Sequence, residues 1–343
     1  MADITIQDIA KMANVSVSSV SRVLTGRPGV NKAKRAEIKE IIKKTGYVPS
    51  ETARSLVRGR SNVVGIIVQE LSNQYYSSMA VAFQRELRKY EYIPFVISAS
   101  TNGEQQESYL AEINKLFDFA GLFISVLSKS SELSQSLQEA KCPVIQLNRT
   151  FDFQSDQVIQ NDYMVGVIAA NHLLGLNHEN LCILAGPMYE SISCQLRWEG
   201  FQQTLLGHGI ELGEDRVIVC QQSMESAEYA TREFFNRLRK EGSPIPTGVF
   251  VCGNSMVLGL LKVCAEFGIR VPEDLAIVTN DNPTIMSLPG IDVTTISIPM
   301  EDMVRNAVDI FRGRLDEPDG KKKTIVLQPE IIVRKSSGVR RES

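Results

Sequence analysis

The sequence predicts a small all-α head followed by an α/β body with two similar subdomains and parallel sheets. Apolar residues recur at helical spacing within residues 1–60. From Val63 onward, short β-branched runs alternate with helical stretches, a pattern that favours parallel α/β sheets. The charge is also uneven, because residues 1–60 hold 12 Lys and Arg against 5 Asp and Glu, whereas the remainder holds 25 against 35. A basic head on an acidic body suggests that the head binds an anion.

The first helix is predicted to begin after Thr5, because Asp8 three residues later completes a pattern typical of a capping box. The apolar positions with helical spacing are Ile6, Ile9, Ala10 and Ala13. Asn14 and Val15 then form a tight turn, since asparagine tolerates a left-handed backbone. Ser16 can cap the next helix.

The second helix carries the residues with the clearest chemistry. Val20, Val23 and Leu24 form one apolar stripe, and the opposite face centres on Ser18 and Arg22. Flanking this face are Val17, Ser19 and Ser21. Arginine can pair bidentately with guanine, and serine can serve bases or phosphates. Taken alone, the helix is equally compatible with a serine-rich surface helix of no special function.

A third helix is predicted over residues 31–44. Ile38, Ile41 and Ile42 lie on one of its sides, and lysines and arginines lie on the other. Three short helices with a tight second turn form a helix-turn-helix, whose second helix enters the major groove of DNA.

The head resembles the DNA-binding domain of the LacI/GalR family of bacterial transcriptional regulators. The matching stretches are TIQDIAKMANVSVSSVSRVLTG and GYVPSETARSL. The resemblance implies that bases are read by Val17, Ser18 and Arg22, and that phosphates are contacted by Thr5, Ser16 and Ser21. Asn31, at the start of the third helix, completes the DNA-binding candidates on the head. Because Val17 lacks the polar group that many members carry, it offers a base pair only methyl contact.

Residues 49–58 are predicted to form a helix of about two turns. Pro49 suits a first helical position, and Gly59 and Arg60 end the segment. Isolated helices shorter than about 12 residues are marginal in water, so this one needs support. The resemblance implies a hinge helix that pairs with its twin in the minor groove, where Leu56, beside Ala53, wedges between base pairs. The arginines expected to contact phosphates are Arg54, Arg58 and Arg60. Alternatively, Leu56 is a linker residue that rests on the body.

The body contains eight apolar strand candidates that split near residue 161 into two groups of four. They are VVGIIV, IPFVISA, GLFISVL and PVIQLN, then LCILAG, RVIVC, GVFVCG and LAIVTND. This part resembles the periplasmic-binding-protein-like core of the same family, on signatures such as RWEGF, GIRVPEDLAIV and TTISIP. The resemblance implies that residues 61–343 bind an effector and dimerise. It places residues 62–161 and 292–320 in one subdomain, and residues 162–291 and 321–336 in the other.

Ligands of open α/β folds bind beside the carboxyl ends of parallel strands. The resemblance implies that the effector contacts Tyr75, Tyr76, Asn148, Arg197 and Asp281. Arg197 with Asp281 can serve hydroxyls or a carboxylate, but a purely structural ion pair is an equal alternative.

Several positions depart from the family pattern. Asn148 replaces an aspartate of many sugar-responsive members, and Thr279-Asn280 replaces the Gly-Phe/Tyr that precedes Asp281. The family's N-D-x-M-A helix start reads Gly253-Asn254-Ser255-Met256-Val257, and an aromatic residue expected near Ser223 is missing. Fewer carboxylates remove acceptors for sugar hydroxyls, so the effector is described only as a sugar or related metabolite.

Other classes of protein find little support. The six cysteines occur singly, which suits buried thiols in a reducing cytosol rather than a disulfide or zinc framework. The histidines have no metal-ligand spacing, no nucleophile or phosphate-loop motif is present, and no run suggests export or a membrane span. We therefore expect a cytoplasmic regulator, not an enzyme, without a cofactor. It would bind a palindromic operator as a homodimer, since the tail SSGVRRES lacks the leucine heptads of a tetramer. A periplasmic-type solute-binding protein without DNA function is the alternative.

Overall fold

The computed structural model describes residues 4–24, 28–47, 61–99, 118–126, 131–147, 154–187, 191–281 and 283–338. Its contacts divide the chain into two units, Met1–Asn62 and Val63–Ser343, which we describe separately. The predicted hinge helix at 49–58, with Ala53 and Leu56, lies outside the described residues. The same is true of Asn148 and of the three arginines of the hinge region.

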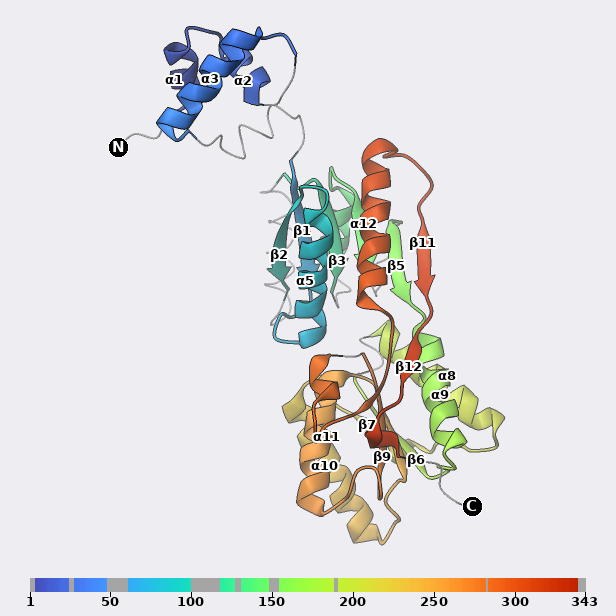
Figure 1. Ribbon diagram of the computed structural model, residues 1–343. Helices are drawn as coiled ribbons and strands as arrows, with labels where there is room; N and C mark the ends of the chain where they lie inside the picture. Colours follow the sequence, from blue (N-terminus) through green and yellow to red (C-terminus); the bar gives the residue numbers. More distant parts are fainter. Residues whose placement is uncertain are drawn as a thin grey trace. The chain divides into compact units, whose positions relative to one another are not determined.

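The head contains the three predicted helices, α1 (Ile6–Met12), α2 (Val17–Leu24) and α3 (Lys32–Thr45) (Figure 1). The capping box of α1 is confirmed, because the Thr5 side chain accepts a hydrogen bond from the Asp8 backbone and the Asp8 side chain accepts one from the Thr5 backbone. Asn14 adopts the left-handed conformation with φ 49°, as expected for the tight turn.

The caps of the other two head helices also follow from the sequence. Ser16 Oγ accepts a hydrogen bond from Ser19 N at 3.3 Å, and Asn31 Oδ1 accepts one from Lys34 N at 2.7 Å. The helices bury a common apolar core to which each contributes at least one side chain. Its fully or nearly fully buried members are Ile9, Ala10, Ala13, Val20, Val23 and Ile38. This core fixes which face of α2 is left for solvent.

The body contains two six-stranded sheets, each wound in the order typical of doubly wound α/β folds. The first sheet has the order β11-β5-β4-β3-β1-β2, and all its described pairings are parallel. Its strands are β1 (Val63–Val68), β2 (Ile93–Ser98), β3 (Gly121–Ser125), β4 (Val144–Leu147), β5 (Asp156–Gln160) and β11 (Thr324–Leu327).

The second sheet has the order β12-β10-β9-β8-β6-β7 and is parallel except for the pairing of β10 with β12. Its strands are β6 (Leu181–Ala185), β7 (Val217–Val219), β8 (Gly248–Val251), β9 (Ala276–Asn280), β10 (Thr294–Ser297) and β12 (Glu330–Ile332). The parallel-dominated architecture confirms the predicted fold class.

Helices cover the two sheets. They are α5 (Gln74–Arg88), α7 (Ser131–Gln138), α8 (Asp162–Gly175), α9 (Ile192–Gly207), α10 (Met224–Glu241), α11 (Asn254–Phe267) and α12 (Met300–Asp316). Short 3₁₀ segments are η1 (Glu214–Arg216), η2 (Thr284–Ser287) and η3 (Lys335–Ser337). No helix within the described ranges combines the length and apolar composition that a membrane span requires.

All eight predicted strands are present, but the prediction of four strands in each group was too low. The four strands that it missed are β5, β10, β11 and β12. β5 reads DQVIQ and alternates buried with half-buried positions, whereas β11 and β12 are partly exposed along their length. A search for continuous apolar runs cannot detect strands of this kind.

The crossings between the subdomains also differ from the prediction. Residues 292–320 were expected in the first subdomain, but β10 pairs with β9 in the second sheet, and only α12 packs with the first. Residues 321–336 were expected in the second subdomain, but β11 pairs with β5 in the first sheet. The chain therefore crosses after β10 and again between β11 and β12, because each strand pairs where its apolar side chains reach a core (Figure 1).

A buried ion pair holds α12 on the first sheet. Arg314 Nε and Nη2 donate to the two carboxylate oxygens of Asp156 at 2.7 and 2.8 Å, and the two side chains are 6% and 2% exposed. Lys323 N donates to the same carboxylate at 2.8 Å, just before β11 begins. Burial alone would raise the pKa of Asp156, but the bonds from Arg314 and Lys323 lower it. These contacts therefore link β5, which the sequence did not predict, to α12 and to the segment that enters β11.

The six cysteines are free thiols, as predicted. Five are buried, and Cys142 is half-buried. Burial raises the pKa of Cys182 and Cys264 to about 12, so these thiols stay protonated at neutral pH.

Two glycines let α8 and α9 pack backbone against backbone. A Cβ on Gly166 would lie 2.0 Å from Arg197 O, and a Cβ on Gly200 would lie 2.1 Å from Tyr163 O. Real Cβ atoms do not approach backbone oxygens so closely, so only glycine fits at either position. This approach places Arg197 of α9 next to the first turn of α8.

Gly200→Ala is therefore expected to lower the free energy of unfolding by about 1–3 kcal/mol, the range typical of overpacking. Gly207→Ala is the matched control, because Gly207 ends the same helix and a Cβ there would meet nothing within 4 Å. That control should be neutral or stabilising by up to about 1 kcal/mol. Urea denaturation followed by circular dichroism measures both variants, and equal stabilities would contradict the close packing of α8 on α9.

Candidate functional site

The head presents a compact polar surface at the start of α2. Ser16, Val17, Ser18 and Arg22 are exposed, whereas Val20 and Val23 on the other side of the helix are buried. The hydroxyl groups cluster, because Ser16 Oγ lies 2.8 Å from Ser18 Oγ and 3.0 Å from Ser19 Oγ. The structure therefore brings together the residues for which base reading was predicted.

Arg22 is placed by the loop that follows α2. Its guanidinium lies against Gly29, where a Cβ would come within 3.2 Å of Arg22 Nη1. Gly29 has φ 108°, a conformation that favours glycine. Ser21 is half-buried beside Arg22. The exposed Arg22 side chain thus runs beside the Gly29 backbone.

The other candidates of the head are cap residues. Thr5 is exposed, and its Oγ1 donates to Asp8 Oδ2 at 2.6 Å; this bond lowers the pKa of Asp8. Asn31 is exposed and caps α3. Both lie at helix N-termini, where backbone N–H groups and the helix dipole favour a phosphate.

In the body, polar side chains from both subdomains line a cavity of about 40 Å³. Its walls comprise Asn73, Tyr75, Tyr76, Gln160, Ser193, Arg197, Gln222, Gly253, Asn254, Ser255 and Asp281. Four of the five predicted effector residues are therefore brought together, and the fifth, Asn148, lies outside the described residues. A larger groove of about 630 Å³ adjoins the cavity and shares Tyr75, Gln160 and Asp281 with it.

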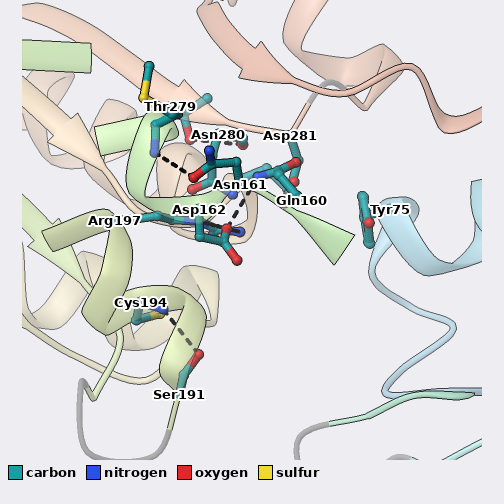
Figure 2. A network of polar contacts seen from close by, with 12 residues as sticks. Tyr75, Gln160, Asn161, Asp162, Ser191, Cys194, Arg197, Thr279, Asn280 and Asp281 are labelled. Atoms are coloured by element: carbon teal, nitrogen blue, oxygen red, sulfur yellow. Dashed lines mark hydrogen bonds and ion pairs between the residues drawn. The ribbon is translucent and has the colours of Figure 1, made fainter. Parts of the chain in front are cut away.

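Arg197 forms an ion pair, but its partner is Asp162, which the sequence did not suggest. Arg197 Nε and Nη2 both lie 2.7 Å from Asp162 Oδ1, and the two side chains are 13% and 6% exposed. Gln160 Nε2 donates to the same oxygen at 3.2 Å (Figure 2). Burial alone would lower the pKa of Arg197, but the charges on Asp162 and Asp281 raise it. Asp162 was missed because it follows β5, one of the strands that the sequence did not predict.

Asp281 stands at the carboxyl end of β9 in the left-handed conformation, with φ 63°. Its N–H donates to Ile296 O at 2.9 Å, and its Oδ2 accepts from Asn254 Nδ2 at 3.2 Å. Burial raises the pKa of Asp281, while Arg197 partly opposes this shift. The described walls of the cavity thus contain one carboxylate, that of Asp281, and one guanidinium, that of Arg197, together with several amides and hydroxyls.

The tyrosines enter from the first subdomain. Asn73 caps α5 by accepting a hydrogen bond from Tyr75 N at 3.0 Å, and this cap presents Tyr75 and Tyr76 in the first turn. Their rings pack edge to face, with centroids 5.2 Å apart. Figure 2 shows Tyr75 on the side of the polar network away from Arg197. No group of three or more potential metal-binding side chains occurs among the residues that the structure describes.

A helix-turn-helix head joined to a two-subdomain α/β body with a polar cavity defines a class of DNA-binding regulators. Residues 5–50 match the profile of the bacterial regulatory proteins of the lacI family, and residues 170–337 match that of the periplasmic binding protein-like domain. The chain thus carries the DNA-binding domain of the lacI family of bacterial regulatory proteins, joined to a periplasmic binding protein-like domain.

Relatives and solved structures match along almost the whole chain. The HTH-type transcriptional repressor PurR of Vibrio vulnificus is 25% identical over 333 residues, which cover 96% of this chain and 97% of that protein. The ribose operon repressor of Haemophilus influenzae is 25% identical over 340 residues, which cover 97% and 98%. In fold, the chain is similar to the Lac repressor dimer bound to operator and the anti-inducer ONPF, with a TM-score of 0.84, 22% identity and coverage of 98% and 99%.

Proposed function

We propose that the chain is a cytoplasmic transcriptional repressor that binds a palindromic operator as a homodimer and responds to a small molecule bound in the polar cavity. The proposal depends on one observation, that a single chain has both an exposed polar helix face in the head and a polar cavity in the body. Its head exposes hydroxyls and one guanidinium on α2, and its body encloses a polar cavity between two α/β subdomains. Named relatives that match almost the whole chain are transcriptional repressors.

The DNA contacts divide into two kinds. Ser18, Arg22 and the methyl groups of Val17 read base edges in the major groove. Thr5, Ser16, Ser21 and Asn31 bind phosphates and fix the position of the head. Two heads related by two-fold symmetry require a symmetric site.

The linker at 49–58 couples the sites. In this proposal, Leu56 beside Ala53 wedges into the minor groove only when two linkers pair. The effector changes how the two first subdomains of the dimer are oriented, and this change decides whether the linkers can pair. Coupling of this kind is typically worth about 1–3 kcal/mol.

The effector is a small polar metabolite. Amides, hydroxyls and the side chains of Arg197 and Asp281 offer both donors and acceptors. Arg197 is already paired with Asp162, so it does not present an unneutralised charge that would select an anion. Tyr75 and Tyr76 provide apolar ring surface for a sugar or a flat heterocycle.

Two other functions are less well supported. A solute-binding protein has no use for a basic head with an exposed arginine and a serine cluster. An enzyme needs groups that do chemistry, and here the buried thiols have raised pKa values while His172 accepts or donates a hydrogen bond with Ser337.

A thermal-shift assay with the intact chain tests the proposed function. A panel of sugars and nucleobases is added to the protein with and without a cognate duplex. We expect one member to change the melting temperature of the free protein and to change its affinity for the duplex. Binding of a panel member that leaves DNA affinity unaltered at every concentration would contradict the coupling.

A further inference from the structure

Asn280 is the last residue of β9, and its side chain is completely buried. Ala276 and Val278, which precede it at alternate positions, pack in the core beneath α8 and α9. Ile296, the parallel partner of Asn280 on β10, packs in the same core. Because side chains alternate along a strand and parallel partners share a face, the Asn280 amide faces the α8–α9 layer. Asp162 and Arg197 belong to these two helices.

Neither polar atom of the Asn280 side chain has a hydrogen-bond partner of ordinary geometry. An amide offers two donor hydrogens and an acceptor oxygen with two lone pairs, and none of these groups is paired. The neighbouring Thr279 is different, because its hydroxyl donates to Val251 O at 3.0 Å. Buried polar groups are nearly always paired in native proteins, and an unpaired one requires an explanation.

The amide lies beside the cavity wall. The next residue, Asp281, lines the cavity, and Figure 2 shows Asn280 within the network that contains Asp281 and Gln160. Burial raises the pKa of Asp281, and Arg197, Asn280 and Asn254 each lower it. Of the two asparagines, only Asn254 donates at hydrogen-bonding geometry.

The cavity itself is smaller than a metabolite. Its volume of about 40 Å³ is little more than the roughly 30 Å³ that one water occupies in the liquid. A sugar or nucleobase that occupies the adjoining groove therefore has to displace part of the wall to reach into this cavity. Asp281 lines the cavity and directly follows Asn280 in the chain, so a ligand that moves the Asp281 side chain can bring its own polar groups to the unpaired amide.

We propose that Asn280 is a specificity-determining residue of the effector site, and that it pairs with a ligand bearing a donor and an acceptor side by side. Adjacent hydroxyls of a sugar or the amide edge of a nucleobase satisfy this requirement. The inference rests on the proposed function, since it assigns the cavity to the effector. It adds a residue at a position where the family pattern has an aromatic side chain.

The test compares Asn280→Leu, which keeps the branched shape but is larger and removes all hydrogen-bonding groups, with the parent chain. Thermal shift is measured without ligand and with ribose, glucose, cellobiose or hypoxanthine. We expect at least one of these probes to raise the melting temperature of the parent. We expect Asn280→Leu to melt roughly 2–6 °C higher without ligand, because an unpaired amide is gone, and to lose the response to that probe.

Two controls complete the design. Asn280→Ala removes the amide and is smaller than asparagine, so it does not overpack the site. It should therefore lose the response to the probe even if the leucine variant fails to fold. Binding to a cognate duplex is measured for the parent and for each variant. A parent chain that binds no duplex would refute the proposed function, and not the role of Asn280. The proposal is overturned if no probe shifts the parent. It is also overturned if the variants retain the melting-temperature response to the probe. That result would mean that the Asn280 amide binds at most a water molecule.

Discussion

Arg197→Met is expected to lower the free energy of unfolding by about 3–5 kcal/mol, because it leaves Asp162 charged and buried without its partner. The guanidinium makes both of its bonds to one carboxylate oxygen, and the pair is almost completely buried. Gln160 still donates to Asp162 in the variant, but one neutral donor does not offset a buried charge. Urea denaturation of the intact chain measures the loss.

Arg232→Met is the matched control for this prediction. Arg232 also bridges two acidic residues, Glu228 and Glu266, but it is 33% exposed. Exposed ion pairs contribute at most about 1 kcal/mol, so this variant should remain close to the parent. The double variant Arg197→Met/Asp162→Leu should recover much of the lost stability, because both charges are removed together. Equal effects of Arg197→Met and Arg232→Met would show that the Asp162 pair is not buried as described.

Arg22→Ala is expected to weaken specific DNA binding by about 1–3 kcal/mol in each half-site and to relax the preference at one base pair there. The reason is the loss of the proposed bidentate contact from the centre of the exposed face of α2. Arg22→Lys keeps the charge but not the planar fork, so it should restore nonspecific affinity without restoring the base preference. Quantitative footprinting on a cognate duplex and its single-base variants resolves these effects.

Lys44→Ala provides a charge-matched control at the far end of α3, where Lys44 pairs with Glu40 on the surface. It removes one positive charge, as Arg22→Ala does, but any effect should be similar for all duplex sequences. An Arg22→Ala chain with an unchanged footprint and an unchanged base preference would remove Arg22 from the reading face.

The head was almost fully predictable because its signals are local. Thr5 with Asp8, Asn14 and Asn31 are capping and turn residues, whose roles depend on neighbours within four positions. The apolar stripe of α2 likewise follows from helical spacing. The placement of Arg22 against Gly29 was not predictable, since it depends on the path of the loop.

The body was predictable in its class but not in its pairings. Central strands can be recognised in the sequence as apolar runs. In contrast, β5 contains Asp156, whose charge is paired by Arg314, about 160 residues later in the chain. The partner of Arg197 was missed for the same reason, because Asp162 starts the helix that directly follows β5 and its position is known only once β5 is known. The close packing at the α8–α9 glycines and the burial of the unpaired Asn280 amide similarly depend on the tertiary structure, so no short segment predicts them.

The central claim is that the two exposed α2 faces of a dimer recognise a symmetric DNA sequence. Selection by the intact chain from a pool of random duplexes, in dilute buffer that preserves phosphate contacts, tests it most directly. We predict enrichment of a palindrome whose half-sites lose their consensus in the Arg22→Ala chain. A pool that remains random after repeated rounds, or that converges on an asymmetric sequence unaffected by Arg22→Ala, would contradict the account.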